Sequence, residues 1–197
     1  MPKLFYQGHG SFRLTADDGR VIYVDPYKGK GESYKAPADI ILVTHQHSDH
    51  NQIKRCAQKP GCRIITNEEA LAGGKHNDFD LDGIQIQAVE AANKNHDPKE
   101  CVGYIINLDG VKLYAGGDTS KTKQMESFSA LALDYALLCG DGFFNMGPEE
   151  AAECARLIGA KHNILIHVKP GQSVAKKAEK WGAPNKLVVA PGQEVTL

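Results

Sequence analysis

Residues 40–50 read IILVTHQHSDH: an apolar run, Ile40–Val43, followed directly by four potential metal ligands within six residues. In an extended segment, side chains two positions apart lie on one face, about 6.6 Å apart along the backbone, so His45 and His47 can turn their imidazoles onto a single ion. Asp49 and His50 are neighbours and cannot both share that face. They suit a second ion beside the first, or a turn in which one residue binds and the other supports it. A polar loop with incidental histidines is the alternative, but unpaired imidazoles and a carboxylate would be costly to bury at a strand end.

Two further candidate ligands follow strand-like runs elsewhere in the chain. Asp118 comes after the run Val111–Ala115 and the pair Gly116-Gly117, and the glycines let the backbone approach closely and aim a carboxylate into a cleft. His167 follows the apolar run Ile164–Ile166. Taken alone, Gly-Asp is a common turn and a histidine after a strand is usually a satisfied core or loop residue. Together with the histidine-rich segment, both are candidate ligands.

Short apolar or alternating runs recur through the chain and are typical of strands. Asp109-Gly110 between two of these runs predicts a tight hairpin, because Asp-Gly tolerates the positive φ of such turns. The runs are Lys3–Tyr6, Ser11–Leu14, Val21–Val24, Ile40–Val43, Arg63–Thr66, Ile84–Val89, Val102–Asn107, Lys112–Tyr114, Tyr135–Leu138, Asn163–Ile166 and Leu187–Val189.

Helical candidates are fewer. Pro148 predicts the first turn of a helix that continues to Leu157, since Glu149 and Glu150 follow at the favourable end of the helix dipole. Weaker candidates are Gln52–Ala57, Asn67–Leu71, Lys123–Phe128 and Ser173–Trp181. Many strands with interspersed helices and no regular βαβ alternation indicate sheets packed together with helices on their outer faces. Without a repeat or a linker, residues 1–197 are expected to form a single domain.

Composition excludes several classes of partner. The chain has 197 residues, of which 42% are hydrophobic, and its 23 basic and 24 acidic side chains nearly cancel. This balance disfavours nucleic acid and anionic membranes as binding partners. No segment approaches the roughly 20 apolar residues of a membrane helix, and Met1–Tyr6 has no apolar core of signal-peptide length. The five cysteines include no C-x-x-C pair, which favours reduced thiols and a cytoplasmic protein.

The order of these motifs carries a family resemblance. T-H-x-H-x-D-H is followed by a histidine in a loop, then G-D-T, then a histidine that ends an apolar strand, and this order resembles the metallo-β-lactamase fold superfamily across most of the chain. The resemblance narrows to the branch of compact metal-dependent hydrolases that includes L-ascorbate-6-phosphate lactonase. The segments that narrow it are Gly8–Phe12, Val24–Pro26, Gly116–Thr119 and Asn145–Ala152.

This resemblance implies an α+β fold of four layers: an αββα sandwich of two mixed β-sheets packed face to face, with helices on the outer faces and metals at one edge. It also implies two ions that share a bridging carboxylate. Their ligands would be His45, His47 and a further histidine for the first ion, Asp49, His50 and His167 for the second, and Asp118 between them. The two carboxylates of this set, Asp49 and Asp118, are the expected catalytic residues.

The third histidine of the first ion is where this chain departs from the family pattern. Many relatives carry Ala-x-His, whereas Glu90–Pro98 reads EAANKNHDP and places Asn93 in the ligand register. We select His96, three residues later, because its polar, proline-broken loop can fold back to present the ring. Asn93 is the alternative ligand or a supporting residue.

Two upstream residues are expected to support the site. Relatives of the family place the residue corresponding to His9 near the cleft, where it would contact the substrate or support a ligand. Asp25, which precedes Pro26, is expected to orient a ligand histidine, because metal-bound imidazoles usually donate their other N–H to a carboxylate or carbonyl.

The ligand types indicate the chemistry. Imidazole and carboxylate without thiolate suit one or two divalent ions, with zinc or manganese first and iron as a third candidate. Such ions would generate hydroxide from bound water at neutral pH and polarise a scissile carbonyl or phosphoryl group. The sequence therefore predicts a hydrolase that uses a metal-bound hydroxide on a small-molecule ester, lactone or phosphoester, with Asp49 positioning the nucleophile. Compact relatives often self-associate, so a homo-oligomer is a further expectation.

Three alternatives have recognisable signatures. A di-iron oxidoreductase of this fold would normally show Glu where Gln46 stands. A phosphodiesterase acting on nucleic acid, or a nuclease, would be expected to bring basic surface and gripping insertions, and neither is visible. A non-enzymatic metal-binding or regulatory module is the alternative from a different class. Replacing Asp49 by Ala separates that module from an enzyme, because only an enzyme would lose turnover.

Overall fold

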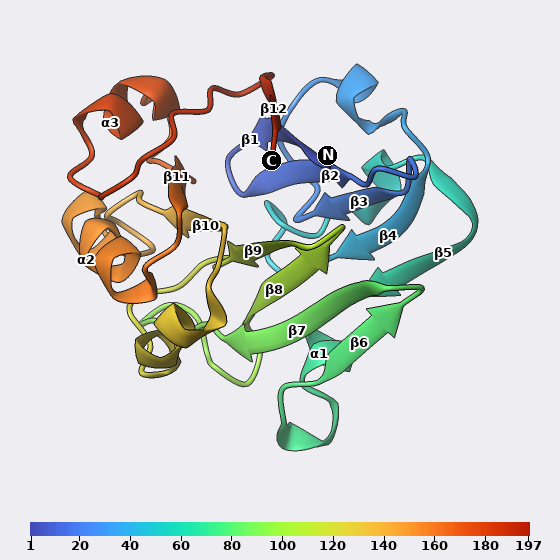
Figure 1. Ribbon diagram of the computed structural model, residues 1–197, viewed down its shortest axis with the longest axis horizontal. Helices are drawn as coiled ribbons and strands as arrows, with labels where there is room; N and C mark the ends of the chain where they lie inside the picture. Colours follow the sequence, from blue (N-terminus) through green and yellow to red (C-terminus); the bar gives the residue numbers. More distant parts are fainter.

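The computed structural model describes residues 1–197 and contains two six-stranded mixed sheets that face each other (Figure 1). In spatial order, the first sheet consists of β12 (Glu194–Thr196), β1 (Lys3–Gly8), β2 (Ser11–Thr15), β3 (Val21–Val24), β4 (Ala38–Leu42) and β5 (Gln58–Ile65). The second sheet consists of β11 (His162–Ile166), β10 (Tyr135–Cys139), β9 (Val111–Ala115), β8 (Val102–Leu108), β7 (Ile84–Glu90) and β6 (Asp78–Leu81). The strands β3-β4-β5 and β9-β10-β11 pair in parallel, and all other neighbours are antiparallel.

The helices are short and lie against the sheets. In Figure 1, α2 (Pro148–Ile158) and α3 (Val174–Lys180) lie beside β10 and β11, while α1 (Asn67–Ala70) follows β5. Four 3₁₀ turns complete the set: η1 (Gly31–Tyr34), η2 (Ile53–Arg55), η3 (Ala72–Gly74) and η4 (Gln124–Leu131). None of the helices combines the length and the apolar character needed to cross a bilayer.

Both faces of the first sheet are buried where β3 and β4 pair. Ile22 and Ile40 point into the main core between the sheets, whereas Tyr23 and Ile41 join a smaller apolar cluster on the opposite face. Successive side chains of a strand point to opposite faces, so a strand that is covered on both sides must be apolar throughout. This explains why these segments read as continuous apolar runs in the sequence.

The predicted fold class, a four-layer αββα sandwich, is confirmed. The hairpin at Asp109-Gly110 is confirmed too, since both residues have positive φ, 52° and 82°, between paired strands β8 and β9. The strand predicted at Leu187–Val189 is wrong. Only Lys186 forms an isolated bridge, to Asn163, and the residues after it pack on the core without a strand partner.

Parallel pairing positions the candidate site. Strands β3 and β4 end together in the first sheet, and β9, β10 and β11 end together in the second. The segments that follow these five ends contain Asp25, the 44–50 segment, Asp118, Asp141 and His167. Loops beyond the carboxyl ends of parallel strands are a common place for functional side chains, and here loops of both sheets converge.

Candidate metal centre

The seven predicted ligands come together, although they are spread from position 45 to position 167. Together with His9, their nitrogen and oxygen atoms form three overlapping groups, and the atoms of each group lie within 4.8 Å of one another. The groups are His45, His47 and His96; His45, His50 and Asp118; and His9, Asp49, His50 and His167. The overlap at His45 and His50 makes these groups one continuous cluster, which includes the predicted supporting residue His9.

The segment after β4 is a turn, not an extended strand. The His50 N–H donates to the His47 carbonyl at 2.9 Å, and this turn separates Asp49 and His50 from the first two histidines. His45 and His47 still meet, with His45 Nε2 at 3.1 Å from His47 Nδ1. The local chain therefore presents two pairs of side chains in two directions, as the sequence pattern indicated.

Asp118 lies between the two histidine sets. Its Oδ1 is 3.3 Å from His50 Nε2 and 3.3 Å from His167 Nε2, whereas its Oδ2 is 3.3 Å from His96 Nε2. Each oxygen of one carboxylate thus faces a different set. Burial disfavours the ionised form, but the neighbouring imidazoles outweigh it and hold the pKa of Asp118 well below its usual value.

Several of these buried atoms have no hydrogen-bond partner. They are His50 Nε2, His96 Nε2, His167 Nε2 and Asp118 Oδ1. Buried polar atoms without partners are rare in folded proteins, because each costs about 1–3 kcal/mol. Two divalent cations would satisfy these four atoms between them, and a set of imidazole nitrogens with carboxylate oxygens is a donor set that such cations accept. The residues present therefore fit a metal centre.

Burial and neighbouring charge shift the pKa values of His45 and His50 in opposite directions. Burial, reinforced by the charge of His50, lowers the pKa of His45 to about 3, so its ring is neutral at physiological pH. Burial acts the same way on His50, but the carboxylates of Asp25 and Asp118 outweigh it and raise its pKa to about 9. Without a cation, a proton on His50 would compensate these carboxylates, and a divalent ion would replace that proton.

Asp25 fixes two of the histidines. Its Oδ2 lies 2.9 Å from His50 Nδ1, and its oxygens accept from the Thr44 backbone N–H at 2.8 Å and the Thr44 hydroxyl at 2.7 Å. Because the hydroxyl has one proton, it can only accept from His45 Nδ1, which lies 3.0 Å away. That assignment leaves His45 Nε2 unprotonated and directed at His47. These are the contacts expected of a residue that orients ligand histidines.

The geometry favours His96 over Asn93 as the third nitrogen of the first set. His96 is buried, and its Nε2 faces Asp118. Asn93 Oδ1 lies 2.9 Å from His96 Nδ1, on the opposite edge of the ring, and Asn93 Nδ2 donates to Asn145 Oδ1 at 2.8 Å. Asn93 therefore holds the ring from behind, and the loop folds back through mutual backbone hydrogen bonds between Asn93 and His96.

Sequence reasoning missed Asp141. Its Oδ2 lies 3.3 Å from His167 Nδ1 and accepts from Asn145 Nδ2 at 2.7 Å. Partial burial opposes ionisation, but the contact with His167 and hydrogen bonds from three backbone N–H groups lower the pKa of Asp141. Asp141 therefore faces the Nδ1 edge of His167, as Asp25 faces the Nδ1 edge of His50, but at a longer distance. The available signal was its place just after the apolar strand Tyr135–Cys139, at the same sheet edge as the other candidates.

His9 lies over the second set. Its Nε2 is 3.0 Å from Asp49 Oδ2, and its ring centroid is 3.6 Å from that of His167. The hydrogen bond from His9 is the largest influence on Asp49 and holds the pKa of that carboxyl below its usual value. His9, Asp25 and His167 all have positive φ, 57°, 46° and 46°, a conformation uncommon for residues other than glycine. Such strain tends to concentrate at functional sites.

Two glycines permit the close approach of these segments. A Cβ on Gly10 would lie 2.8 Å from His50 Cε1, and a Cβ on Gly117 would lie 3.0 Å from the Thr44 side chain. Gly117 also has a φ of +63°. The double glycine before Asp118 therefore serves the close approach that the sequence indicated.

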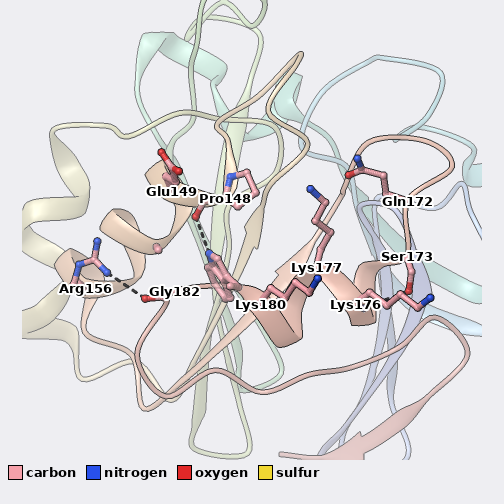
Figure 2. A pocket seen from close by; sticks show the side chains of 11 residues that line it. Pro148, Glu149, Arg156, Gln172, Ser173, Lys176, Lys177, Lys180 and Gly182 are labelled. Carbon is pink, nitrogen blue, oxygen red and sulfur yellow. Dashed lines mark hydrogen bonds between the residues drawn. The ribbon is translucent and has the colours of Figure 1, made fainter.

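The candidate centre is open on one side. His45, His47 and His96 line a hollow of about 460 Å³ together with Gln46, Asn67 and Glu68. A separate pocket of about 660 Å³ lies between α2 and α3 and contains none of the predicted site residues (Figure 2). Within its lining, Trp181 Nε1 donates to the Pro148 carbonyl at 2.9 Å. A ligand at the candidate centre would therefore enter through the smaller hollow or beside the partly exposed Asp49.

Comparison with known proteins gives a consistent result. A model of the beta-lactamase superfamily domain matches residues 3–167. The chain is 31% identical to a UPF0173 metal-dependent hydrolase of Thermococcus onnurineus and 29% identical to one of Pyrococcus furiosus, each over the whole of both chains. It superposes on Igni18, a metallo hydrolase of Ignicoccus hospitalis, with a TM-score of 0.76 and 25% identity, covering 98% of this chain and 97% of the other.

Proposed function

We propose a substrate class for this chain, which belongs to the metallo-β-lactamase superfamily and is a metal-dependent hydrolase. The substrate is a small molecule with an ester, lactone or phosphoester bond, and it is hydrolysed at a centre of two divalent ions. The observation that carries the proposal is the position of Asp118: its Oδ2 faces the unpartnered Nε2 of His96, and its Oδ1 faces the unpartnered Nε2 atoms of His50 and His167. A carboxylate in that position can serve two ions at once.

The residues would divide between two ions of zinc or manganese, with iron as a further candidate. His45, His47 and His96 would hold the first, Asp49, His50 and His167 the second, and Asp118 both. When bound, such ions lower the pKa of a water molecule from about 15.7 toward about 7 and withdraw charge from a scissile carbonyl or phosphoryl group.

Asp49 is the residue positioned to accept the proton that an attacking water releases. Its side chain is 38% exposed, unlike the buried Asp118, and it is ionised at neutral pH, with the hydrogen bond from His9 holding its pKa below the usual value. It can therefore orient an attacking water and accept the proton released in the attack. His9, whose own pKa burial lowers, remains an uncharged partner that fixes the carboxylate.

The size and charge of the molecule favour a small substrate. The hollow beside the first histidine set, about 460 Å³, falls within the roughly 300–1,000 Å³ of small-molecule sites. A net charge of −1 provides no general attraction for a polyanion. These features support an ester, lactone or phosphorylated sugar ester before a phosphodiester of nucleic acid.

The test is hydrolysis of a panel of small esters, lactones, phosphomonoesters and phosphodiesters before and after exhaustive chelation. Turnover should fall by at least about 100-fold on chelation and return with Mn²⁺ or Zn²⁺. Unchanged turnover by fully metal-free protein would remove the proposal. Asp49→Ala should abolish turnover as well. A variant that hydrolysed the same substrate at the wild-type rate would remove the proton-handling role of Asp49.

A further inference from the structure

Two large aromatic side chains are exposed beside the candidate centre. Phe143 is 61% exposed and Phe144 is 54% exposed, and Met1 is the only other large hydrophobic residue in this class. Water in contact with two adjacent rings is unfavourable, so a cluster of this kind indicates a surface that something covers.

The two rings contact each other, and hydrogen bonds hold the backbone that carries them. Their centroids are 4.7 Å apart at an interplanar angle of 88°, and the Lys169 ammonium lies 5.8 Å above the Phe143 ring. Asp141 Oδ1 accepts from the backbone N–H groups of Phe143 at 2.6 Å and Phe144 at 2.7 Å. Asn95 Nδ2 also donates to the Phe144 carbonyl at 2.7 Å. A backbone held in this way loses little further entropy when a ligand binds.

The same contacts tie the rings to both halves of the candidate centre. Asp141, which fixes their backbone, lies against His167 through its other oxygen. Asn145, the next residue in the chain, bonds to the side chain of Asn93 behind His96. The backbone that carries the rings is thus held in place relative to the proposed ligands, as a substrate-positioning surface needs.

We propose that Phe143 and Phe144 bind an apolar group of the substrate, aryl or branched alkyl, while its scissile bond lies at the candidate metal centre. This inference rests on the proposed function and narrows its substrate class to esters, lactones or phosphoesters with such a group. The rings would select the substrate by apolar contact and take no part in bond cleavage.

A binding experiment tests the rings without turnover. Isothermal titration of the zinc-loaded protein compares 4-phenylbutyrate with butyrate, whose difference is the phenyl group alone. The wild type should bind the phenyl ligand at least about 10-fold more tightly, because burying a ring of this size is worth that factor or more. The doubly substituted variant F143A/F144A should lose most of that preference, and F143L/F144L should keep part of it.

Phe5→Ala is the matched control. Phe5 is also partly exposed beneath a cation, with the Arg13 guanidinium 5.1 Å from its ring, but it lines a pocket that contains no predicted site residue. This variant should keep the wild-type preference. An unchanged preference in F143A/F144A, or no preference in the wild type, overturns the inference. So does an association of wild-type chains in sedimentation that F143A/F144A loses while its ligand preference stays unchanged.

A kinetic arm separates this inference from the proposed function. With γ-phenyl-γ-butyrolactone, F143A/F144A should show KM raised about 10-fold and kcat retained, whereas γ-butyrolactone should show no change. If the wild type hydrolyses γ-phenyl-γ-butyrolactone and F143A/F144A shows the same KM for it, the inference is overturned and the proposed function is left intact. The wild type could also hydrolyse nothing in the panel and still prefer the phenyl ligand in a way that requires the rings. That result overturns the proposed function and supports the binding role of the rings.

Discussion

At the scale of single residues, the choice between Asn93 and His96 decides how the first ion would be held. His96 directs Nε2 at Asp118, and Asn93 contacts the other ring nitrogen at 2.9 Å. His96 would bind the ion, and Asn93 would orient the His96 ring.

Replacing each residue distinguishes these roles. His96→Ala should lower the bound metal from about two equivalents to about one, because it removes a ligand of the first ion only. Asn93→Ala should keep two sites but weaken one by about 10-fold to 100-fold, as the loss of an orienting partner usually does. Competitive titration with a chromophoric chelator measures both. Equal effects of the two substitutions would contradict the assignment.

A second prediction concerns Gly10. A methyl group there would lie 2.8 Å from the His50 ring, so Gly10→Ala should displace the ring, destabilise the protein by about 1–3 kcal/mol and weaken metal binding. Gly31→Ala is the control, because nothing lies within 4 Å of its Cβ position. Urea unfolding compares the two variants, and equal stability would show that His50 does not need this close approach.

The sequence was sufficient to identify most residues of the cluster, but not Asp141. Four ligand types in the 44–50 segment are conspicuous, whereas Gly140-Asp141-Gly142 reads as an ordinary turn. Its contact with His167 depends on β10 and β11 being parallel neighbours, which local sequence does not reveal. The role of Asn93 was also hidden, because the fold of its loop decides which side chain faces Asp118.

At the scale of elements, apolar pattern predicted the strands that are buried and missed those that are not. Strand β6, with the sequence DFDL, and the three-residue strand β12 lie at sheet edges, and none of their residues is fully buried. The opposite error occurred at Leu187–Val189, where apolar residues pack on the core without a strand partner. An apolar pattern in the sequence indicates that a segment is buried. It does not indicate whether that segment pairs with a neighbouring strand.

Asp134 provides a prediction on pH at this scale, because it joins three strands. Its carboxylate accepts from the Lys112 backbone N–H at 2.9 Å, at the start of β9, and from the Lys161 ammonium at 2.7 Å, just before β11. Partial burial opposes ionisation, but these two hydrogen bonds outweigh it and lower the pKa of Asp134. A lowered pKa means that the stabilisation is present above the unfolded value of about 3.9 and is lost as pH falls.

Asp134→Asn should therefore reduce the free energy of unfolding by about 1 kcal/mol at pH 7, and the difference from wild type should shrink below about pH 4. Denaturant unfolding at both pH values measures this. A difference that stayed constant across the range would show that the charge of Asp134 contributes nothing.

At the scale of the whole molecule, the proposed ligands come from both sheets. The 44–50 segment follows β4 of the first sheet, whereas Asp118 and His167 follow β9 and β11 of the second. Bound ions would therefore connect the two halves of the sandwich, and their binding free energy would add to the stability of the whole fold.

Metal removal should accordingly lower the melting temperature. At metal concentrations about 100 times Kd, binding adds about 2.7 kcal/mol, which corresponds to about 5–10 °C for a chain of this size. Calorimetry with and without chelator measures the shift, and Asp118→Ala should show much less of it. The same melting temperature for loaded and metal-free protein would mean that the ions do not join the sheets.

Anomalous diffraction from crystals of the purified protein, recorded at the absorption edge of the metal found by elemental analysis, tests the metal centre most directly. We predict two peaks, one beside His45, His47 and His96 and one beside His50 and His167, with Asp118 between them. Protein that hydrolyses its substrate but shows no peak among these side chains would contradict this account.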